Sequence, residues 1–202
     1  MKKLLTPLLA MMLVGCQQAS TTEINVDVTE DMDTATSIEV VPAPETQSKI
    51  KWTCPSCNEN EKHVLRELQV TAKITDRNAL STIMGNIKSE SNFHPNICEG
   101  GARVNYNQCH SGGFGLIQWT TVGRYKNLGF FASKYGCNPS TIECQTRFLI
   151  NEVHFQKVLP EFQNEGYAIH QYMAPAFYWL GWGIKGDRES FSHQYHAKLV
   201  QA

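Results

Sequence analysis

The sequence lacks the signals of several common protein classes. It has no glycine-rich phosphate-binding loop, no Ser-His-Asp set, no basic patch suited to nucleic acid and no internal repeat. These absences argue against a nucleotide-dependent enzyme, a triad hydrolase, a nucleic-acid-binding protein and a repeat protein. The 202 residues also carry almost no net charge, −1 at pH 7.

Aromatic residues are missing from residues 17–49. This stretch has no periodic apolar pattern, and it carries seven acids against a single base, Lys49. Such a composition cannot bury enough apolar surface to offset the entropy lost on ordering. We therefore expect residues 16–49 to be an acidic, disordered tether. The remaining residues, 50–202, keep 15 of the 18 bases and 12 of the 19 acids, which makes the expected folded domain mildly basic.

The apolar run at the N-terminus is short. "MKKLLTPLLAMMLVGC" is too short to span a bilayer comfortably and begins with two lysines after the initial methionine. Both features favour a secretory signal, rather than a transmembrane helix, in residues 1–15. Its ending resembles the lipobox of bacterial lipoprotein signals, in which the cysteine is lipidated. We predict lipidation of Cys16 and, because Gln17 rather than Asp follows, an anchor on the periplasmic face of the outer membrane. A plain signal peptide with a chance cysteine is the alternative.

The seven cysteines fit this interpretation. Assigning Cys16 to lipid leaves six, an even number that suits three disulfides in an oxidising compartment. Six cysteines allow 15 connectivities, and spacing favours local pairs. The predicted pairs are Cys98–Cys109, Cys137–Cys144 and Cys54–Cys57.

Two cysteine and histidine patterns suggest other chemistry. "WTCPSC" has the spacing of a redox motif or, with His63, of a zinc half-site, but the strand–helix–strand context of a redox motif is missing. His193 and His196 are three residues apart without the glutamate of a metalloprotease helix. We expect a structural disulfide and surface histidines, with no metal and no cofactor. A zinc peptidase remains an alternative, testable by metal-dependent peptide cleavage.

The pattern of apolar residues predicts a mainly α domain. Helical spacing recurs in Glu59–Lys73, after a plausible N-cap at Asp76, and in Thr141–Val158. A last helical region, "YMAPAFYWLGWGI", is interrupted by a proline and glycines. Residues 96–115 hold five glycines and two cysteines, which predicts a long loop or a small hairpin.

One acid, Glu90, lies at the end of the helix predicted after Asp76. Because Ile83, Ile87 and Glu90 follow an i, i+4, i+7 pattern, the acid should face the edge of the core. Burial and the negative end of the helix dipole both raise the pKa of a carboxyl group there. A carboxylic acid that stays protonated near neutral pH is what a glycosidase uses to protonate a leaving group. A solvated acid at a helix end is the alternative.

A glycine-rich segment, "SGGFGLIQWTTVGR", follows about 20 residues later. Gly112, Gly113 and Gly115 allow unusual backbone conformations or a close approach to a ligand. Gln118 and Trp119 add an amide and a flat ring, two surfaces that suit a sugar polymer. Alone, such a cluster is more often only a turn.

Together the two segments resemble a known family. "E-S-x-F-x-P" followed by "G-x-G-L-x-Q-W-T" is similar to the phage tail lysozyme family, within the lysozyme-like group that includes goose-type lysozymes and soluble lytic transglycosylases. The resemblance covers roughly residues 58–185. Two features depart from the family pattern: the loop after the acid is long and holds two cysteines, and the N-terminal tether has no counterpart.

The resemblance implies a lysozyme-like helical domain that acts on peptidoglycan, and the six cysteines predict that this domain is stabilised by disulfides. The expected reaction is cleavage of the β-1,4 bond between N-acetylmuramic acid and N-acetylglucosamine, with Glu90 as catalytic acid and Gly115 and Gln118 in the glycan cleft. Other residues are expected to contact the sugar as well. These are Ser91, Gly113, Trp119, Tyr178 and Trp179, with Trp182 as the alternative to Trp179.

Several points stay open at this stage. Glu99 is the nearest candidate for a second carboxylate, although in a glycine-rich loop a solvated role is favoured. Related transglycosylases work with one acid, so hydrolysis and formation of 1,6-anhydro ends are both possible. A non-catalytic glycan-binding module with the same fold is the rival from another class. We expect the protein to act as a monomer.

Overall fold

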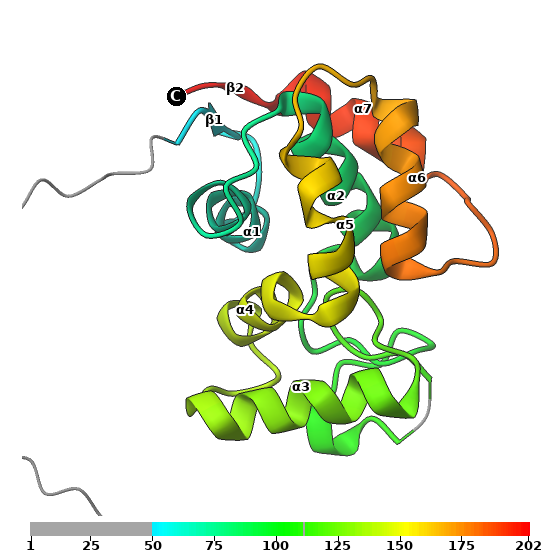
Figure 1. Cartoon of the computed structure of the whole chain (residues 1–202). Helices are drawn as coiled ribbons and strands as arrows, with labels where there is room; N and C mark the ends of the chain where they lie inside the picture. The colour runs from blue at the N-terminus through cyan, green and yellow to red at the C-terminus, as the bar shows by residue number, and fades with distance from the viewer. Residues whose placement is uncertain (1–49, 111) are drawn as a thin grey trace, which may run out of the picture. The chain divides into compact units, whose positions relative to one another are not determined.

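The structure, a computed structural model, describes residues 50–110 and 112–202, and these are mainly helical (Figure 1). The predicted signal, the predicted lipidation site Cys16 and the predicted tether all lie outside the described residues. The elements are β1 (Trp52–Thr53), α1 (Glu59–Val70), α2 (Arg77–Ser91), the 3-10 helix η1 (Tyr106–Gln108), α3 (Val122–Tyr135), α4 (Ile142–Asn151), α5 (Val153–Gln163), α6 (Ile169–Leu180), α7 (Arg188–Lys198) and β2 (Val200–Gln201).

Helix α2 forms the centre of the domain, with α1, α5, α6 and α7 packed around it (Figure 1). Asp76 caps its start as predicted, accepting a hydrogen bond from the Ala79 N–H at 2.9 Å. Every residue from 79 to 87 is buried, so the helix is covered on all sides rather than along one stripe. Its buried hydroxyls stay satisfied because Ser81 and Thr82 donate back to carbonyls four residues earlier.

Two helices were not predicted from the sequence. Helix α3 is capped at its start by Thr121, whose hydroxyl accepts from the Arg124 N–H, and at its end by Gly136 in the left-handed conformation. Helix α7 packs along α2, where a Cβ added to Gly85 would lie 2.4 Å from the Ser192 backbone nitrogen. Both helices carry few buried apolar residues, so their periodic signal in the sequence is weak.

The helix predicted over Thr141–Val158 is two helices. Glu152 takes an extended backbone conformation, with ψ 135°, and ends α4 where α5 starts. Its buried carboxylate pairs with Arg124 of α3, a tertiary contact that local periodicity does not reveal. The proline expected to interrupt the last helix lies instead inside an unbroken α6.

The three predicted disulfides are present. The Cα atoms of Cys54 and Cys57 are 5.3 Å apart, and those of the Cys98–Cys109 and Cys137–Cys144 pairs are 5.6 Å apart. The Cys98–Cys109 bond closes the loop between α2 and the glycine segment, in which Cys98 also bridges to Phe114. A closed loop of this length stabilises the fold by up to about 3 kcal/mol in the chain-entropy estimate.

The two ends of the described domain meet in a two-stranded antiparallel sheet. Trp52 pairs with Gln201, and Thr53 pairs with Val200. Within residues 50–110 and 112–202, no helix combines the length and the apolar character needed to cross a membrane.

Candidate active site

The end of α2 lies directly on the glycine segment. The Ser91 hydroxyl donates to the Leu116 carbonyl at 2.7 Å, and Ser91 is only 4 % exposed. The structure therefore brings the acid-bearing helix and the glycine loop together, as the resemblance implied. The prediction that Ser91 contacts substrate is wrong, because its buried hydroxyl already holds the loop.

Gly115 shapes the loop through its backbone rather than by offering groups to a ligand. It is buried, has φ +71°, and donates its N–H to the Ile97 carbonyl at 2.8 Å. A Cβ there would lie 2.5 Å from Gln145 Oε1, and this oxygen also accepts from the Leu116 N–H at 2.7 Å. Glycine is required at this position for the loop to pack on α4.

We expect Gly115→Ala to destabilise the domain by about 3 kcal/mol. The new methyl group would clash with Gln145, and alanine is strained in the left-handed backbone conformation of this residue. Chemical denaturation of the variant measures the loss. Gly123→Ala is the matched control, since a Cβ there meets nothing within 4 Å and the residue lies in α3. Equal stability of the two variants would contradict this view of the loop.

Gly113, Glu99 and Gln118 are tied into the same loop. The Gly113 N–H donates to Glu99 Oε2 at 2.9 Å, and the Gly113 carbonyl accepts from the Glu99 N–H at 2.8 Å. The Gln118 side chain donates to the Gly115 carbonyl at 3.1 Å and is partly exposed. Gly113 therefore has no free backbone group for a sugar, and Glu99 serves the loop. Gln118 is partly exposed and Glu99 is exposed, so both side chains reach the surface, and only Gly113 is buried.

The aromatic residues that were predicted to contact the sugar differ in how far they are buried. Trp119 packs on Phe148 with ring centroids 5.2 Å apart, and Trp179 packs on Phe155 at 5.0 Å; both tryptophans are at most 1 % exposed. Neither indole can stack on a saccharide, so these two predictions are wrong. Tyr178, in contrast, is 74 % exposed.

Tyr178 belongs to a group of rings at the end of α6. Phe177 lies 5.9 Å from the Tyr178 ring and 5.3 Å from the Trp182 ring, between centroids. Phe177 is exposed and Trp182 is partly buried. We call Phe177, Tyr178 and Trp182 the aromatic group. Its Trp182 is the alternative to Trp179 that the sequence left open.

Glu90 lies between the glycine segment and α7. Its side chain is 15 % exposed, and its Oε1 is 2.8 Å from Nη2 of Arg188, the first residue of α7. Burial raises the pKa of this carboxyl group, while the charges of Arg188 and Arg124 and the hydrogen bond from Arg188 oppose the rise; the pKa remains above its usual value. The prediction of a partly buried acid with a raised pKa is confirmed.

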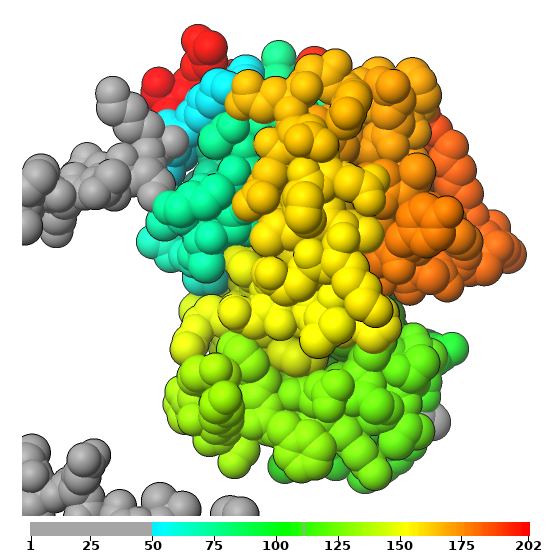
Figure 2. Space-filling view, viewed as in Figure 1, coloured from blue at the N-terminus to red at the C-terminus, as the bar shows by residue number. Residues whose placement is uncertain are grey.

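Arg188 links the acid to the aromatic group. Its guanidinium carbon lies 4.9 Å from the centre of the Trp182 ring, so Trp182, Arg188 and Glu90 follow one another in space. The molecular outline in Figure 2 is recessed where the orange residues before α7 meet the green residues near the glycine segment. Sequence patterns gave no signal for Arg188, because the weakly amphipathic α7 was not predicted.

A second buried ion pair stands on the α3 side of the site. Arg124 donates from Nε and Nη2 to both oxygens of Glu152, at 2.6 and 2.7 Å. Their side chains are 14 % and 5 % exposed. The pair joins the start of α3 to the α4–α5 break, and its arginine also acts on Glu90. Sequence reasoning missed it, since nothing local relates residues 28 positions apart.

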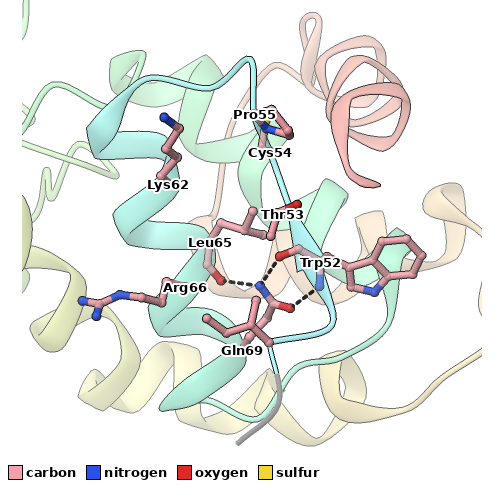
Figure 3. Close-up of a pocket in the computed structure, with 9 residues that line it drawn as sticks. Trp52, Thr53, Cys54, Pro55, Lys62, Leu65, Arg66 and Gln69 are labelled. Atoms are coloured by element: carbon pink, nitrogen blue, oxygen red, sulfur yellow. Dashed lines mark hydrogen bonds between the residues drawn. The ribbon is translucent and has the colours of Figure 1, made fainter. Parts of the chain in front are cut away.

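An apolar pocket of 240 Å³ lies away from this acid, between the first strand and α1 (Figure 3). Figure 3 shows the Gln69 amide on its wall, accepting from the Trp52 N–H and donating to the Trp52 and Leu65 carbonyls. None of its lining residues comes from α2, the glycine segment or α7. The pocket therefore belongs to a different part of the surface.

The described residues also bear on the zinc alternative. Among them, no three His, Cys, Asp or Glu side chains gather closely enough to hold a metal ion. Cys54 and Cys57 are joined to each other, and His193 is exposed.

Comparison with known families agrees with the site. A family model for phage tail lysozymes matches residues 59–179, which include the acid, the glycine segment and most of the helices, and the chain belongs to this family. The family places it among lysozyme-like proteins that act on peptidoglycan. No curated protein and no solved structure matches the chain.

Proposed function

We propose that this protein cleaves the β-1,4 bond between N-acetylmuramic acid and N-acetylglucosamine in peptidoglycan, with Glu90 as the catalytic residue. One observation carries the proposal: a partly buried carboxyl group with a raised pKa lies directly before Ser91, which holds the glycine segment, and pairs with Arg188, which lies over Trp182 of the aromatic group. A solvated helix-end acid needs no such surroundings.

Glu90 acts twice in the proposed reaction. As a protonated acid it donates its proton to the glycosidic oxygen while the bond from that oxygen to the anomeric carbon breaks. The resulting carboxylate then takes a proton from the water that adds to the anomeric carbon, which regenerates the acid. The aromatic group stacks on neighbouring saccharides, with Tyr178 offering the most exposed ring. Gln118 contributes its partly exposed amide.

One observation favours the transglycosylase alternative. The two other carboxylates near the site are both engaged, Glu99 by the Gly113 N–H and Glu152 by Arg124. Glu152 has no free oxygen for water, and Glu99 is an exposed side chain that uses one oxygen to hold the glycine loop. A one-acid reaction in which the sugar's own 6-hydroxyl attacks would leave 1,6-anhydro ends, whereas hydrolysis leaves reducing ends. Mass analysis of digested sacculi separates the two products.

A non-catalytic glycan-binding module is the rival from another class. Such a module would bind purified sacculi and release nothing from them. Incubation of the protein with sacculi, followed by measurement of soluble glycan fragments, distinguishes the enzyme from the module. The proposed enzyme works as a monomer, without metal or cofactor.

We further propose that the chain is exported and held by lipid at Cys16, on the periplasmic face of the outer membrane. Cys16→Ser is expected to prevent lipidation and to move the protein to the soluble or the unprocessed fraction, because the thiol is the group to which the lipid is attached. Cell fractionation with detection of the protein in each fraction measures this. Wild-type protein found in the soluble fraction would contradict the anchor.

A further inference from the structure

The two largely buried Arg–Glu pairs of the described domain have different geometries. In the Arg124–Glu152 pair both carboxylate oxygens accept a hydrogen bond, so the acid is fully occupied. In the Arg188–Glu90 pair one nitrogen, Nη2, lies 2.8 Å from one oxygen, Oε1. Among residues 50–110 and 112–202, no other ion pair or hydrogen bond reaches the Glu90 carboxylate. Its second oxygen, Oε2, is therefore left for another partner.

Arg188 is itself held firmly at both ends. Its carbonyl accepts from the Ser192 hydroxyl at 2.8 Å, and Ser192 packs against Gly85, which fixes the start of α7 on α2. Its guanidinium lies over the Trp182 ring at 4.9 Å. The guanidinium thus has a defined position relative to Glu90, five residues along α2 from Gly85.

The remaining donors of Arg188 indicate that the Arg188–Glu90 contact does more than stabilise the fold. Nε and Nη1 are buried, and they have no hydrogen-bond partner among the described residues. Burying an arginine with unmatched donors is costly. At Arg124 the same chain gives two guanidinium nitrogens a carboxylate partner, so the one-sided contact at Arg188 calls for a role in the reaction.

We propose that Arg188 is the positioning residue of the acid: it holds Oε1 of Glu90 so that Oε2 presents the proton to the glycan, and its charge stabilises the carboxylate left after proton transfer. The inference rests on the proposed function. Arg188 also meets a need of the second step, in which Glu90 is a carboxylate, because a carboxylate formed in surroundings this buried needs a counter-charge.

Charges from two elements act on Glu90, and they are unequal. Arg188 comes from α7 and acts both by charge and by its hydrogen bond, whereas Arg124 comes from α3 and acts by charge alone. Arg124 is already paired with Glu152. Burial, the largest influence on the pKa of Glu90, acts in the opposite direction to both cations. Removing the Arg188 charge should therefore raise that pKa further.

The test compares Arg188→Met with Arg188→Lys, which keeps the charge but not the planar group. The rate of glycan release from purified sacculi is followed against pH. In Arg188→Met the rate should fall about tenfold or more. Its decline at high pH should move upward by about one pH unit or more, because the acid keeps its proton longer. Arg188→Lys should retain the wild-type pH range with a smaller loss of rate.

Lys185→Met is the control for a general charge effect, since Lys185 lies three residues before Arg188 and pairs with Glu189 instead. It should leave both rate and pH range unchanged. Equal losses in Arg188→Met and Arg188→Lys at every pH, with no movement of the alkaline decline, would mean that Arg188 only supports the fold, and the proposal would be wrong.

A second measurement keeps the inference separate from the proposed function. Carbon NMR of the labelled Glu90 carboxyl group follows its titration without any need for activity. The midpoint should move to higher pH in Arg188→Met and stay near the wild-type value in Arg188→Lys. A wild-type protein inactive on sacculi would defeat the proposed function, while an unmoved Glu90 midpoint in Arg188→Met would defeat the role of Arg188.

Discussion

Glu90→Gln is expected to lower the rate of peptidoglycan cleavage by on the order of 10²-fold or more. Glutamine keeps the size of the side chain, and its oxygen can still accept from Arg188, but it has no proton to give to a leaving group. Clearing of purified sacculi measures the rate. Circular dichroism should show the variant folded, because the carboxylate makes only one contact with the described protein.

Glu143→Gln is the matched control for this prediction. Glu143 is an exposed residue in the first turn of α4, and no role in the reaction is assigned to it. The same chemical change there should leave activity unchanged. A Glu90→Gln variant that clears sacculi at nearly the wild-type rate would end the proposed mechanism, whatever the state of the rest of the site.

Arg124→Met is expected to have the largest effect on stability, a loss of about 3–5 kcal/mol in the free energy of unfolding. The substitution leaves the Glu152 carboxylate, 5 % exposed, without its bidentate partner. Because Glu152 also marks the break between α4 and α5, the loss should affect the packing of α3 against α4. Denaturant unfolding of the purified protein measures the change.

A double variant separates the lost pair from the lost arginine. Arg124→Met combined with Glu152→Leu removes both charges, so no unpaired carboxylate remains buried. It should recover much of the stability, since replacing a buried pair by apolar groups is often nearly neutral. If the free energy of unfolding of Arg124→Met is within about 0.5 kcal/mol of the wild-type value, this pair contributes no more than an ordinary surface contact.

The position of the acid followed from local rules. Asp76 signals the start of a helix, and counting from Ile83 along that helix places Glu90 near the edge of the core. The glycine segment was recognised because its residues are unusual in type, and the three disulfides followed from short spacing. Each of these features depends on residues close together in the sequence.

The surroundings of the acid did not follow from the sequence. Arg188 reaches Glu90 only because α7 packs along α2, and Arg124 meets Glu152 only because α3 lies against the α4–α5 break. The predictions that the two tryptophans contact the sugar were wrong for a related reason. A flat ring next to a glycine loop suits a sugar, but Trp119 packs into the core on Phe148. The sequence shows that residue 119 carries an indole ring, but it does not show which way that ring points.

The most direct test of the central claim is mass analysis of the material released from purified sacculi by the wild-type protein. The account predicts soluble glycan fragments that carry newly formed N-acetylmuramic acid ends, reducing if water adds and 1,6-anhydro if the sugar closes on itself. Intact sacculi with bound protein, or the release of peptides alone, would contradict it.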